Sequence, residues 1–290
     1  MNLILKFNLV FITIFLAGLG IAGYVAERLL QQNAREEMLH SARLVMEAAL
    51  STRGYTSSQV GPLLQTQMKY SFLPQSVPAY SATEVLSGLR KRFPEYTYKE
   101  ATLNPTNPRN RAVDWETDVV NDFRNNAEHR EIIGERDTPT GRLLYIARPI
   151  RIGDPACLTC HSTVDAAPKT LVERYGPANG FGWRLNEVVG AQVVSVPTDV
   201  PIQRARAAFR NLMLSLGAIF LAVGVVLNLM LLYTVIIPVS RLANLADRVS
   251  LGAMDVPDFK VRSRDEIRLL ADSFNRMKKS LVQAMKMLED

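Results

Sequence analysis

The segment with the clearest chemistry is the run Cys157-Leu158-Thr159-Cys160-His161. Two thiols separated by two residues, with an imidazole directly after the second, form the Cys-x-x-Cys-His signature of covalent c-type haem attachment. Each thiol can form a thioether with one vinyl group of the same haem edge, and the imidazole can then take an axial position on the iron. We therefore expect one covalently bound haem c on Cys157 and Cys160, with His161 as the proximal iron ligand.

The alternatives for these residues are a redox dithiol and half of a zinc site. A zinc site needs two more Cys or His ligands at suitable spacing. The chain has only two cysteines, and its other two histidines, His40 and His129, lie far from the motif in sequence. Because both cysteines fall inside one motif, covalent haem is the favoured interpretation.

A second axial ligand is expected from the N-terminal part of the region that contains the motif, since helices there can close the distal face of the haem. Both His and Met serve as haem ligands. The main candidates are His40, Met46 and Met68, with Met38 and His129 also in the region. Each also has a simpler explanation, as a solvated residue or as core packing. An open or water-occupied site is an equal alternative and would suit a gas ligand.

Two uncharged apolar runs lie on either side of the motif. Residues 7–25 and 212–239 contain no charged side chain, and each is long enough for a helix across a bilayer, which needs ~20 apolar residues. Asn228 is the one strongly polar residue inside the second run. We expect transmembrane helices at 7–25 and 209–237, and a cleaved signal peptide is the alternative for the first.

The haem motif orients the chain, because c-type attachment takes place outside the cytoplasmic membrane. Residues 1–6 and 238–290 would then be cytoplasmic, and residues 26–208 periplasmic. The expected location is the inner membrane of a bacterium, crossed twice. Cytoplasmic segments next to a membrane usually carry an excess of basic residues, and Arg241 agrees with this orientation. The basic cluster at 204–210 would lie on the outer side and mildly opposes the orientation.

Composition excludes some classes of function. The net charge of +6 does not indicate nucleic-acid binding, because the 34 basic residues are scattered and are balanced by 28 acidic ones. No nucleophile, metal cluster or pair of carboxylates with usable spacing indicates an enzyme, so we expect none. Residues 26–208 are long enough for one domain with a core of its own.

The region between the apolar runs has mixed α and β patterns. Residues 26–50 lack Gly and Pro and would continue the first span as a stalk helix. The pattern Ser81 to Glu84 resembles a capping box and predicts that a helix opens there. Further helices are expected from Asp114 and over 169–175, and strands over 96–103, 132–133, 143–152 and 188–196, with a hairpin turn at 138–141. Helices ahead of a small antiparallel sheet that holds a ligand predict an α+β, PAS-like sensor domain.

Four stretches resemble a known family: EATLNPTNPRNRAVDWE, GERDTPTGRLLYIARPIR, CLTCHS and RYGPANGFGWRLNEVVGAQVVSVP. They are similar to the periplasmic c-type haem domain of bacterial receptors, over residues 53–197. That family is PAS-like and often precedes a HAMP module. The resemblance implies covalent haem on Cys157 and Cys160 with His161 as proximal ligand, and it leaves the sensed ligand open.

The C-terminal region carries a second pattern. Pro238 ends the second span, and a heptad pattern over 242–249 follows until Gly252 and Pro257 interrupt it. Asp265 and Glu266 then open a helix whose apolar residues alternate in steps of three and four, as a coiled-coil seam requires. This arrangement resembles an all-α HAMP module over 238–290, a parallel four-helix bundle in a homodimer, and a generic coiled coil is the alternative. The seam residues are Ile267, Leu270, Phe274, Met277, Leu281, Ala284 and Leu288.

Two classes of function follow. In the first, the chain is a membrane-bound haem c receptor, in which redox poise or a small gas (NO, CO or O2) changes the haem domain and the HAMP module passes that change across the membrane. In the second, it is a membrane-anchored periplasmic cytochrome for electron transfer. The HAMP-like pattern favours the receptor, because an electron carrier needs no cytoplasmic relay. The sequence carries no kinase, cyclase or methyl-accepting segment, so we expect either a receptor subunit that acts through a separate cytoplasmic partner or a receptor whose output segment was lost.

Overall fold

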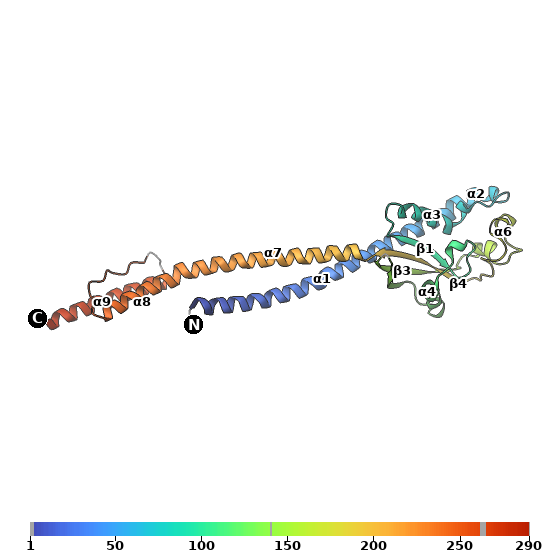
Figure 1. Cartoon of the computed structure of the whole chain (residues 1–290). Helices are drawn as coiled ribbons and strands as arrows, with labels where there is room; N and C mark the ends of the chain where they lie inside the picture. Colours follow the sequence, from blue (N-terminus) through green and yellow to red (C-terminus); the bar gives the residue numbers. More distant parts are fainter. Residues whose placement is uncertain (1–2, 140, 262–264, 290) are drawn as a thin grey trace. The chain divides into compact units, whose positions relative to one another are not determined.

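The computed structural model describes residues 3–139, 141–261 and 265–289, except for the side chains of residues 288 and 289 (Figure 1). The chain divides into two compact units. Residues Glu27–Ala208 form the large unit, which contains the Cys-x-x-Cys-His motif. Residues Met1–Ala26 and Phe209–Asp290 form the helical unit, which contains both apolar runs.

The large unit combines helices with one sheet, as the sequence predicts. Helix α1 (Leu3–Tyr55) is continuous from the helical unit into the large unit, which confirms the helix expected over 26–50, and a π-helical turn, η1 (Thr56–Val60), follows it. The other helices are α2 (Gly61–Met68), α3 (Pro78–Arg90), α4 (Asp114–Asn125), α5 (Leu158–His161) and α6 (Lys169–Tyr175), with 3-10 turns η2 (Pro74–Ser76), η3 (Pro108–Asn110) and η4 (Pro155–Cys157).

Four strands form one antiparallel sheet in the order β1-β4-β3-β2. The four predicted strands and the hairpin between β2 and β3 are present, but β2 is longer than the predicted 132–133, and Thr140 in the hairpin turn lies outside the described residues. The register between β3 and β4 shifts at Ile150/Arg151, shortly before the motif. The strands are β1 (Thr97–Thr102), β2 (Ile132–Thr138), β3 (Gly141–Arg151) and β4 (Val188–Pro197).

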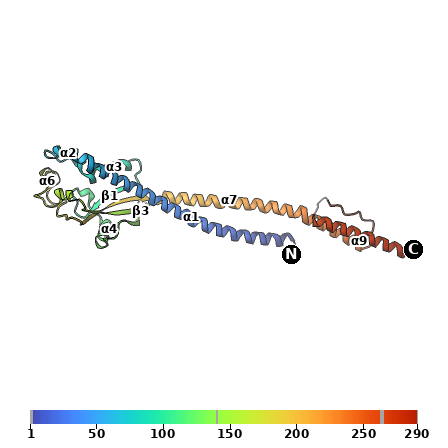
Figure 2. The same cartoon turned by 180° about the vertical axis from the view of Figure 1, so that it is seen from behind.

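The central strand β4 is buried on both faces because helices cover both sides of the sheet (Figures 1 and 2). Val194 and Val196 pack in one cluster with Met46 of α1. Val193, on the opposite face, packs in another cluster with Phe123 of α4. A strand buried on both faces gives a near-continuous apolar run instead of an alternating one, and this explains the sequence VVGAQVVSV.

Helix α3 begins three residues earlier than the sequence predicts. Ser81 to Glu84 resemble a capping box, but the helix starts at Pro78, with Val77 extended before it. Proline suits the first helical position, because its φ matches a helix and its missing N–H has no intrahelical partner there. The hydroxyl of Ser81 donates to the carbonyl of Gln75 at 3.1 Å.

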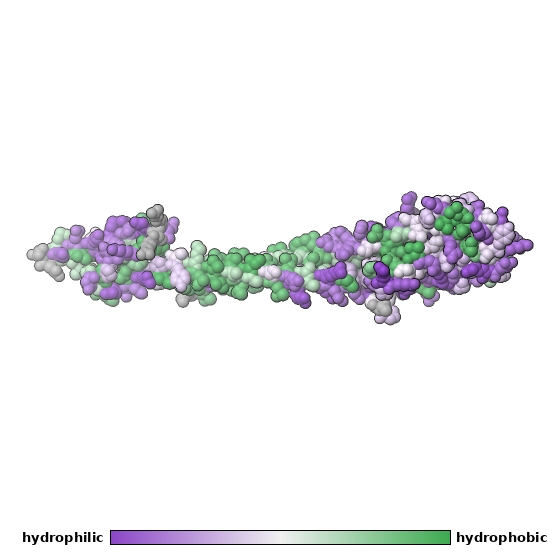
Figure 3. Space-filling model, turned by 90° about the horizontal axis from the view of Figure 1, so that it is seen from above, coloured by the Kyte–Doolittle hydropathy of each residue, from purple (hydrophilic) through white to green (hydrophobic). Residues whose placement is uncertain are grey.

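In the helical unit, two helices are long and apolar enough to cross a membrane, judged by length and composition. One is the first part of α1, and the other is α7 (Asp199–Leu231). The apolar windows of both are unburied within the chain, and Figure 3 shows this hydrophobic surface in green. The two helices contact each other in this unit, where the rings of Phe15 and Phe220 meet edge-on with centroids 3.9 Å apart.

Pro238 does not end the helix that carries the second apolar run. A π-helical turn, η5 (Leu232–Ile236), follows α7, and helix α8 (Ile237–Ser250) continues directly from it. Proline inside a helix removes one hydrogen bond and crowds the carbonyl four residues earlier. The π-helical turn directly before Pro238 shifts the hydrogen-bonding pattern there, and this accommodates the proline without a break.

Helices α8 and α9 (Glu266–Glu289) pack together over the connector between them. The side-chain amide of Asn275 holds this connector, because it donates to the carbonyl of Phe259 and accepts from the N–H of the same residue, at 3.0 and 2.9 Å. Of the predicted seam, Leu270, Met277 and Leu281 stay exposed, while the side chain of Leu288 lies outside the described residues. The buried cluster of this module comprises Leu242, Val249, Val256 and Phe274.

Candidate haem-binding site

The two cysteines lie on a short helical segment directly after strand β3. The carboxylate of Asp154 accepts from the N–H of Ala156 at 2.8 Å and so begins the turn η4, which ends at Cys157. The single turn of α5 then carries Cys160 and His161. Residues three apart on a helical turn share one face, so the local fold presents both thiols together. Both are free and half-buried.

His161 is held in one orientation by its surroundings. Its Nδ1 lies 2.7 Å from the carbonyl oxygen of Gly180, and a carbonyl only accepts, so Nδ1 carries the proton and Nε2 keeps a free lone pair. The ring also stacks on Trp183, with centroids 3.9 Å apart and planes 15° apart. Burial lowers the pKa of His161, against the opposing effect of the Gly180 carbonyl. A neutral imidazole whose second nitrogen is fixed by a carbonyl is the form that binds a metal.

The loop that supplies Gly180 is fixed by residues that sequence reasoning did not single out. Asn104 accepts from the N–H of Gly180 and donates to the carbonyl of Phe181, both at 3.2 Å. Gly180 has φ +87°, and a Cβ there would collide with Thr106. In the sequence, the turn-rich run NPTNP and the glycines of GPANGFG each indicate a loop. Nothing in either run indicates that the two loops meet.

Apolar and aromatic side chains surround Cys160. The ring of Tyr175 meets Phe72 edge-on at 5.7 Å between centroids. Helix α2, next to this cluster in sequence, buries none of its own residues although it contains Leu63, Leu64 and Met68. The cluster comprises Phe72, Ala167 and Leu171, with Met68, Val77, Cys160, Val172, Tyr175 and Phe181 packed against it. In Figures 1 and 2, α2 and α6 lie at the same end of the large unit.

The three distal candidates occupy three different environments. His40 is exposed on α1. Met46 is fully buried, in the cluster between α1 and the sheet. Met68, the last residue of α2, packs in the cluster of Cys160, and its carbonyl accepts from the hydroxyl of Thr170 at 3.0 Å. The structure therefore brings Met68, but neither His40 nor Met46, into the same cluster as the motif.

The other two residues considered lie apart from the motif. Met38 is buried in the same cluster as Met46. His129 pairs with Asp122 of α4 at 2.9 Å. Among the described residues, no group of three or more His, Cys, Asp or Glu is placed to hold a metal ion.

A largely buried ion pair joins the end of α1 to strand β1. Nη1 of Arg53, in the last turn of α1, contacts both carboxylate oxygens of Glu100 at 2.6 and 2.5 Å. The hydroxyl of Tyr98 donates to the same carboxylate at 2.7 Å, and Gln192 donates to that hydroxyl at 3.4 Å. Burial alone would lower the pKa of Arg53, but the Glu100 carboxylate offsets this and keeps the pKa above its ordinary value. Burial, and then Glu100, raise the pKa of Tyr98.

The pKa values of the two thiols are also shifted by their surroundings. Burial and the nearby Asp154 raise the pKa of Cys157, while the charge of Arg53 opposes that rise. Burial, followed by the neighbouring Cys157, raises the pKa of Cys160. Both pKa values are therefore shifted towards the protonated thiol.

Comparison with protein-family models gives two matches. Residues 31–197 match a family described as Tll0287-like, which is more than half of the chain. Residues 231–283 match the HAMP domain. The first matched region corresponds to the domain that holds the motif, and the second covers helix α8 and the first part of helix α9.

Among solved structures, the chain is similar to the crystal structure of the cyanobacterial haem protein Tll0287. The two share 18% sequence identity, and the match covers 57% of this chain and 91% of the other, with a TM-score of 0.38. No curated protein shows significant similarity to the chain.

Proposed function

Because the chain belongs to the Tll0287-like family and carries a HAMP domain after that region, we propose that it is a membrane-bound haem c sensor. It would report a redox change or a diatomic gas across the membrane. The observation that carries this proposal is the motif Cys157-x-x-Cys160-His161, with Nδ1 of His161 donating to Gly180 and Nε2 left as a free ligand atom.

The residues around the motif fit a haem. The two thiols share one helical face, which suits thioether formation, and the lowered pKa of His161 favours the neutral ring that binds a metal. The apolar cluster of Cys160 and the apolar, unburied helix α2 suit a flat apolar ring. When bound, the haem would supply one-electron redox chemistry and a coordination position on iron. The chain would hold it by two covalent bonds and one axial ligand, and the cluster around Cys160 would exclude water.

We propose Met68 as the distal ligand. Its place in the cluster of Cys160 supports this choice over His40, which is exposed, and over Met46, which fills the core between α1 and the sheet. A thioether opposite an imidazole raises the potential of a haem. An open site remains the alternative to be tested, and it is the arrangement that would bind a gas directly.

The proposed topology follows from the haem. Residues 1–6 and 238–290 would be cytoplasmic, 7–25 and 209–237 would cross the bacterial inner membrane, and 26–208 would lie in the periplasm, where c-type attachment occurs. The two apolar helices support this division, since their surfaces are unburied within the chain.

We propose that the protein works as a homodimer through its HAMP domain. Leu270, Met277 and Leu281 are 47%, 52% and 42% exposed, and a second copy would bury this seam in a parallel four-helix bundle. Such bundles can hold two packings of similar free energy, so a small shift of the preceding helix can select one. A separate cytoplasmic partner would read the result.

Haem attachment is tested directly. The protein, expressed with a c-type haem maturation system, should keep its colour after denaturation and extraction with acidic acetone. Its pyridine adduct should have the c-type spectrum. Cys157→Ser with Cys160→Ser should abolish covalent attachment, and full extraction of haem from the matured wild-type protein would contradict the proposal.

A second experiment separates the receptor from a membrane-anchored electron-transfer cytochrome, the alternative function. Single cysteines at Leu270, Phe274 and Met277 should cross-link two copies, and the yield should change when the haem is reduced. Lys279→Cys, on an exposed position of the same helix, is the control and should cross-link less. A cross-linking yield that is the same in the oxidised and the reduced protein would favour the electron-transfer cytochrome.

A further inference from the structure

The sulfur of Met68 accepts a hydrogen bond from the chain that follows it. The N–H of Leu73 donates to Sδ of Met68 at 3.1 Å, and the hydroxyl oxygen of Ser76 lies 3.4 Å from the same sulfur. A thioether is a weak acceptor, and methionine more often fills gaps in a core with its flexible side chain, as Met46 does between α1 and the sheet. The polar contacts at Met68 therefore fix a side chain that packing alone would leave free to change its rotamer.

One lone pair of this sulfur stays free. A thioether sulfur has two lone pairs, and the N–H of Leu73 occupies one of them. Ser76 has a single hydroxyl hydrogen, and the carbonyl of Leu73 lies nearer to its oxygen, at 2.8 Å. Because a carbonyl is also the stronger acceptor, the hydroxyl donates there and leaves the second lone pair of the sulfur unoccupied. His161 shows the same division, with Nδ1 bound to the Gly180 carbonyl and Nε2 free.

Ser76 determines where the N–H of Leu73 lies. Leu73 is extended, with φ −104° and ψ 101°, directly before the turn η2. Both the hydroxyl and the N–H of Ser76 donate to the carbonyl of Leu73, at 2.8 and 3.0 Å. Pro74, between them in the turn, is buried. These contacts hold the backbone of Leu73, and with it the donor to the Met68 sulfur, in one place.

The same loop is anchored in the apolar cluster that surrounds Cys160. Phe72, directly before Leu73, is 5% exposed and is a member of this cluster. Met68 and Cys160 both pack against the cluster. The carbonyl of Met68 also accepts from the hydroxyl of Thr170 in α6, at 3.0 Å. The sulfur and its donor are therefore fixed in the same cluster as one of the two proposed attachment residues.

We propose that the turn Leu73–Ser76, with Ser76 as the positioning residue, orients Met68 as a ligand of the haem iron and raises the reduction potential of the haem. This inference rests on the proposed function. Hydrogen bonds to ligand groups are one of the means by which a protein orients a ligand and tunes its metal. The bond from Leu73 withdraws electron density from the sulfur, which makes the sulfur a weaker donor.

The sign of the effect follows from the charge of the iron. Ferric iron carries one more positive charge than ferrous iron, so it loses more when the donor atom is weakened. A fixed sulfur also binds iron at a lower entropic cost than a mobile one, and a thioether ligand itself raises the potential. Both effects of the turn therefore favour the ferrous state, and loss of Ser76 should lower the potential.

The experiment measures the midpoint potential of the full-length, haem-loaded protein by spectroelectrochemistry. Ser76→Ala should lower the ferrous-to-ferric ratio at a fixed potential by about fivefold, the effect of one net hydrogen bond. Ser76→Thr keeps the hydroxyl and should restore the potential of the wild type. Ser81→Ala is the matched control, because the hydroxyl of Ser81 donates to the Gln75 carbonyl of the same turn at 3.1 Å. It should leave the ratio within about twofold of the wild type.

The variant Met68→Leu separates an effect through the sulfur from a general effect on the fold. Leucine has no sulfur to accept the bond from Leu73. In the Met68→Leu background, Ser76→Ala should therefore cause no further change in the potential. An equal shift in both backgrounds would show that Ser76 acts on the haem by another route, and this would refute the proposal.

The remaining outcomes each decide one claim. Absence of covalent haem in the wild type refutes the proposed function. Covalent haem with an unchanged spectrum in Met68→Leu refutes Met68 as a ligand, and this inference with it, but leaves haem attachment intact. A spectrum that changes in Met68→Leu, together with an unchanged or raised potential in Ser76→Ala, refutes the role of Ser76 alone. An equal fall in Ser81→Ala refutes that role as well.

Discussion

Asn8 and Asn228, 220 positions apart in the sequence, exchange two side-chain hydrogen bonds of 2.8 Å each. They lie on the two helices that are apolar enough to cross a membrane. Each amide also donates to a carbonyl of its own helix, that of Ile4 or of Gly224. In an apolar environment each amide needs a partner, so this pair specifies how the two helices are aligned.

We predict that Asn228→Leu loosens this alignment, because it leaves Asn8 without its partner at a cost of about 1 kcal/mol. Cysteines at Phe15 and Phe220, whose rings are 3.9 Å apart, should form an intrachain disulfide less efficiently in this variant. The control is Thr234→Val, because the hydroxyl of Thr234 bonds to Met230 of its own helix. Equal disulfide yields in both variants would show that the amide pair does not set the alignment.

Gly180→Ala should disturb the orientation of His161. The residue has φ +87°, and an added Cβ would also collide with Thr106. Gly182, in the same loop, has φ +82° with open space around it, so Gly182→Ala isolates the backbone strain. We expect a loss of unfolding free energy of about 3 kcal/mol for Gly180→Ala and about 1 kcal/mol for Gly182→Ala.

Only Gly180→Ala should also change the absorption spectrum of the haem, since Gly180 supplies the carbonyl that holds Nδ1 of His161. An unchanged spectrum in this variant would mean that the carbonyl does not orient the proximal ligand.

Met68→Leu should convert the iron from six-coordinate and low-spin to five-coordinate and high-spin, because leucine fills the same volume but has no lone pair. Absorption and electron paramagnetic resonance spectra report this change. Met46→Leu makes the same replacement in the core between α1 and the sheet and should leave both spectra unchanged. If Met68→Leu is also silent, the distal site is open or another residue fills it.

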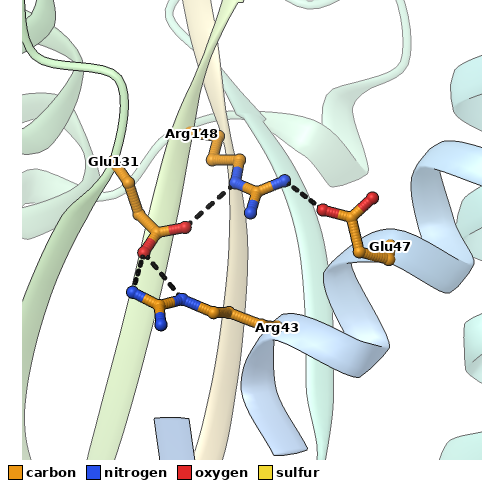
Figure 4. Close-up of polar contacts among 4 residues, drawn as sticks. All are labelled: Arg43, Glu47, Glu131 and Arg148. Carbon is orange, nitrogen blue, oxygen red and sulfur yellow. Dashed lines mark hydrogen bonds and ion pairs between the residues drawn. The ribbon is translucent and has the colours of Figure 1, made fainter. Parts of the chain in front are cut away.

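The ion network of Arg43, Glu47, Glu131 and Arg148 (Figure 4) predicts a pH dependence of stability. Burial alone would raise the pKa of Glu131, but hydrogen bonds from Arg43 and Arg148 more than offset this and lower it. When folding lowers the pKa of a carboxyl, its ionised form stabilises the folded state. This contribution is complete at pH values above the unfolded-state pKa, about 4.3, and is lost as the pH falls through the folded-state pKa.

Glu131→Gln should therefore lower Tm at neutral pH, by about 2–4 °C, and have little effect at a pH well below the folded-state pKa. Tryptophan fluorescence reports this unfolding, since Trp115 and Trp183, the only tryptophans, both lie in the large unit. Glu128→Gln, an exposed carboxyl three residues earlier, is the control. Equal losses of stability at both pH values would contradict the assignment.

Several features of this protein follow from the sequence because they depend on near neighbours. The spacing of Cys157, Cys160 and His161 predicts covalent haem attachment from five consecutive residues. The two apolar runs and the strands also depend on local composition, and the long helix and the sheet are where the sequence predicts them. The α8–α9 module was recognisable for the same reason, since its seam repeats at regular intervals along the chain.

Other features depended on contacts between distant segments, which no local pattern encodes. His40, Met46 and Met68 are equivalent candidates in sequence, and only the contacts of Met68 with residues of α6 separate it from the others. The pairs Asn8–Asn228 and Arg53–Glu100 join residues 220 and 47 positions apart. The residue types and spacing of the motif, on α5 and directly before it, limit the chemistry that the motif can carry out. The tertiary fold decides which groups hold His161, because folding alone brings Gly180 and Trp183 into contact with its ring.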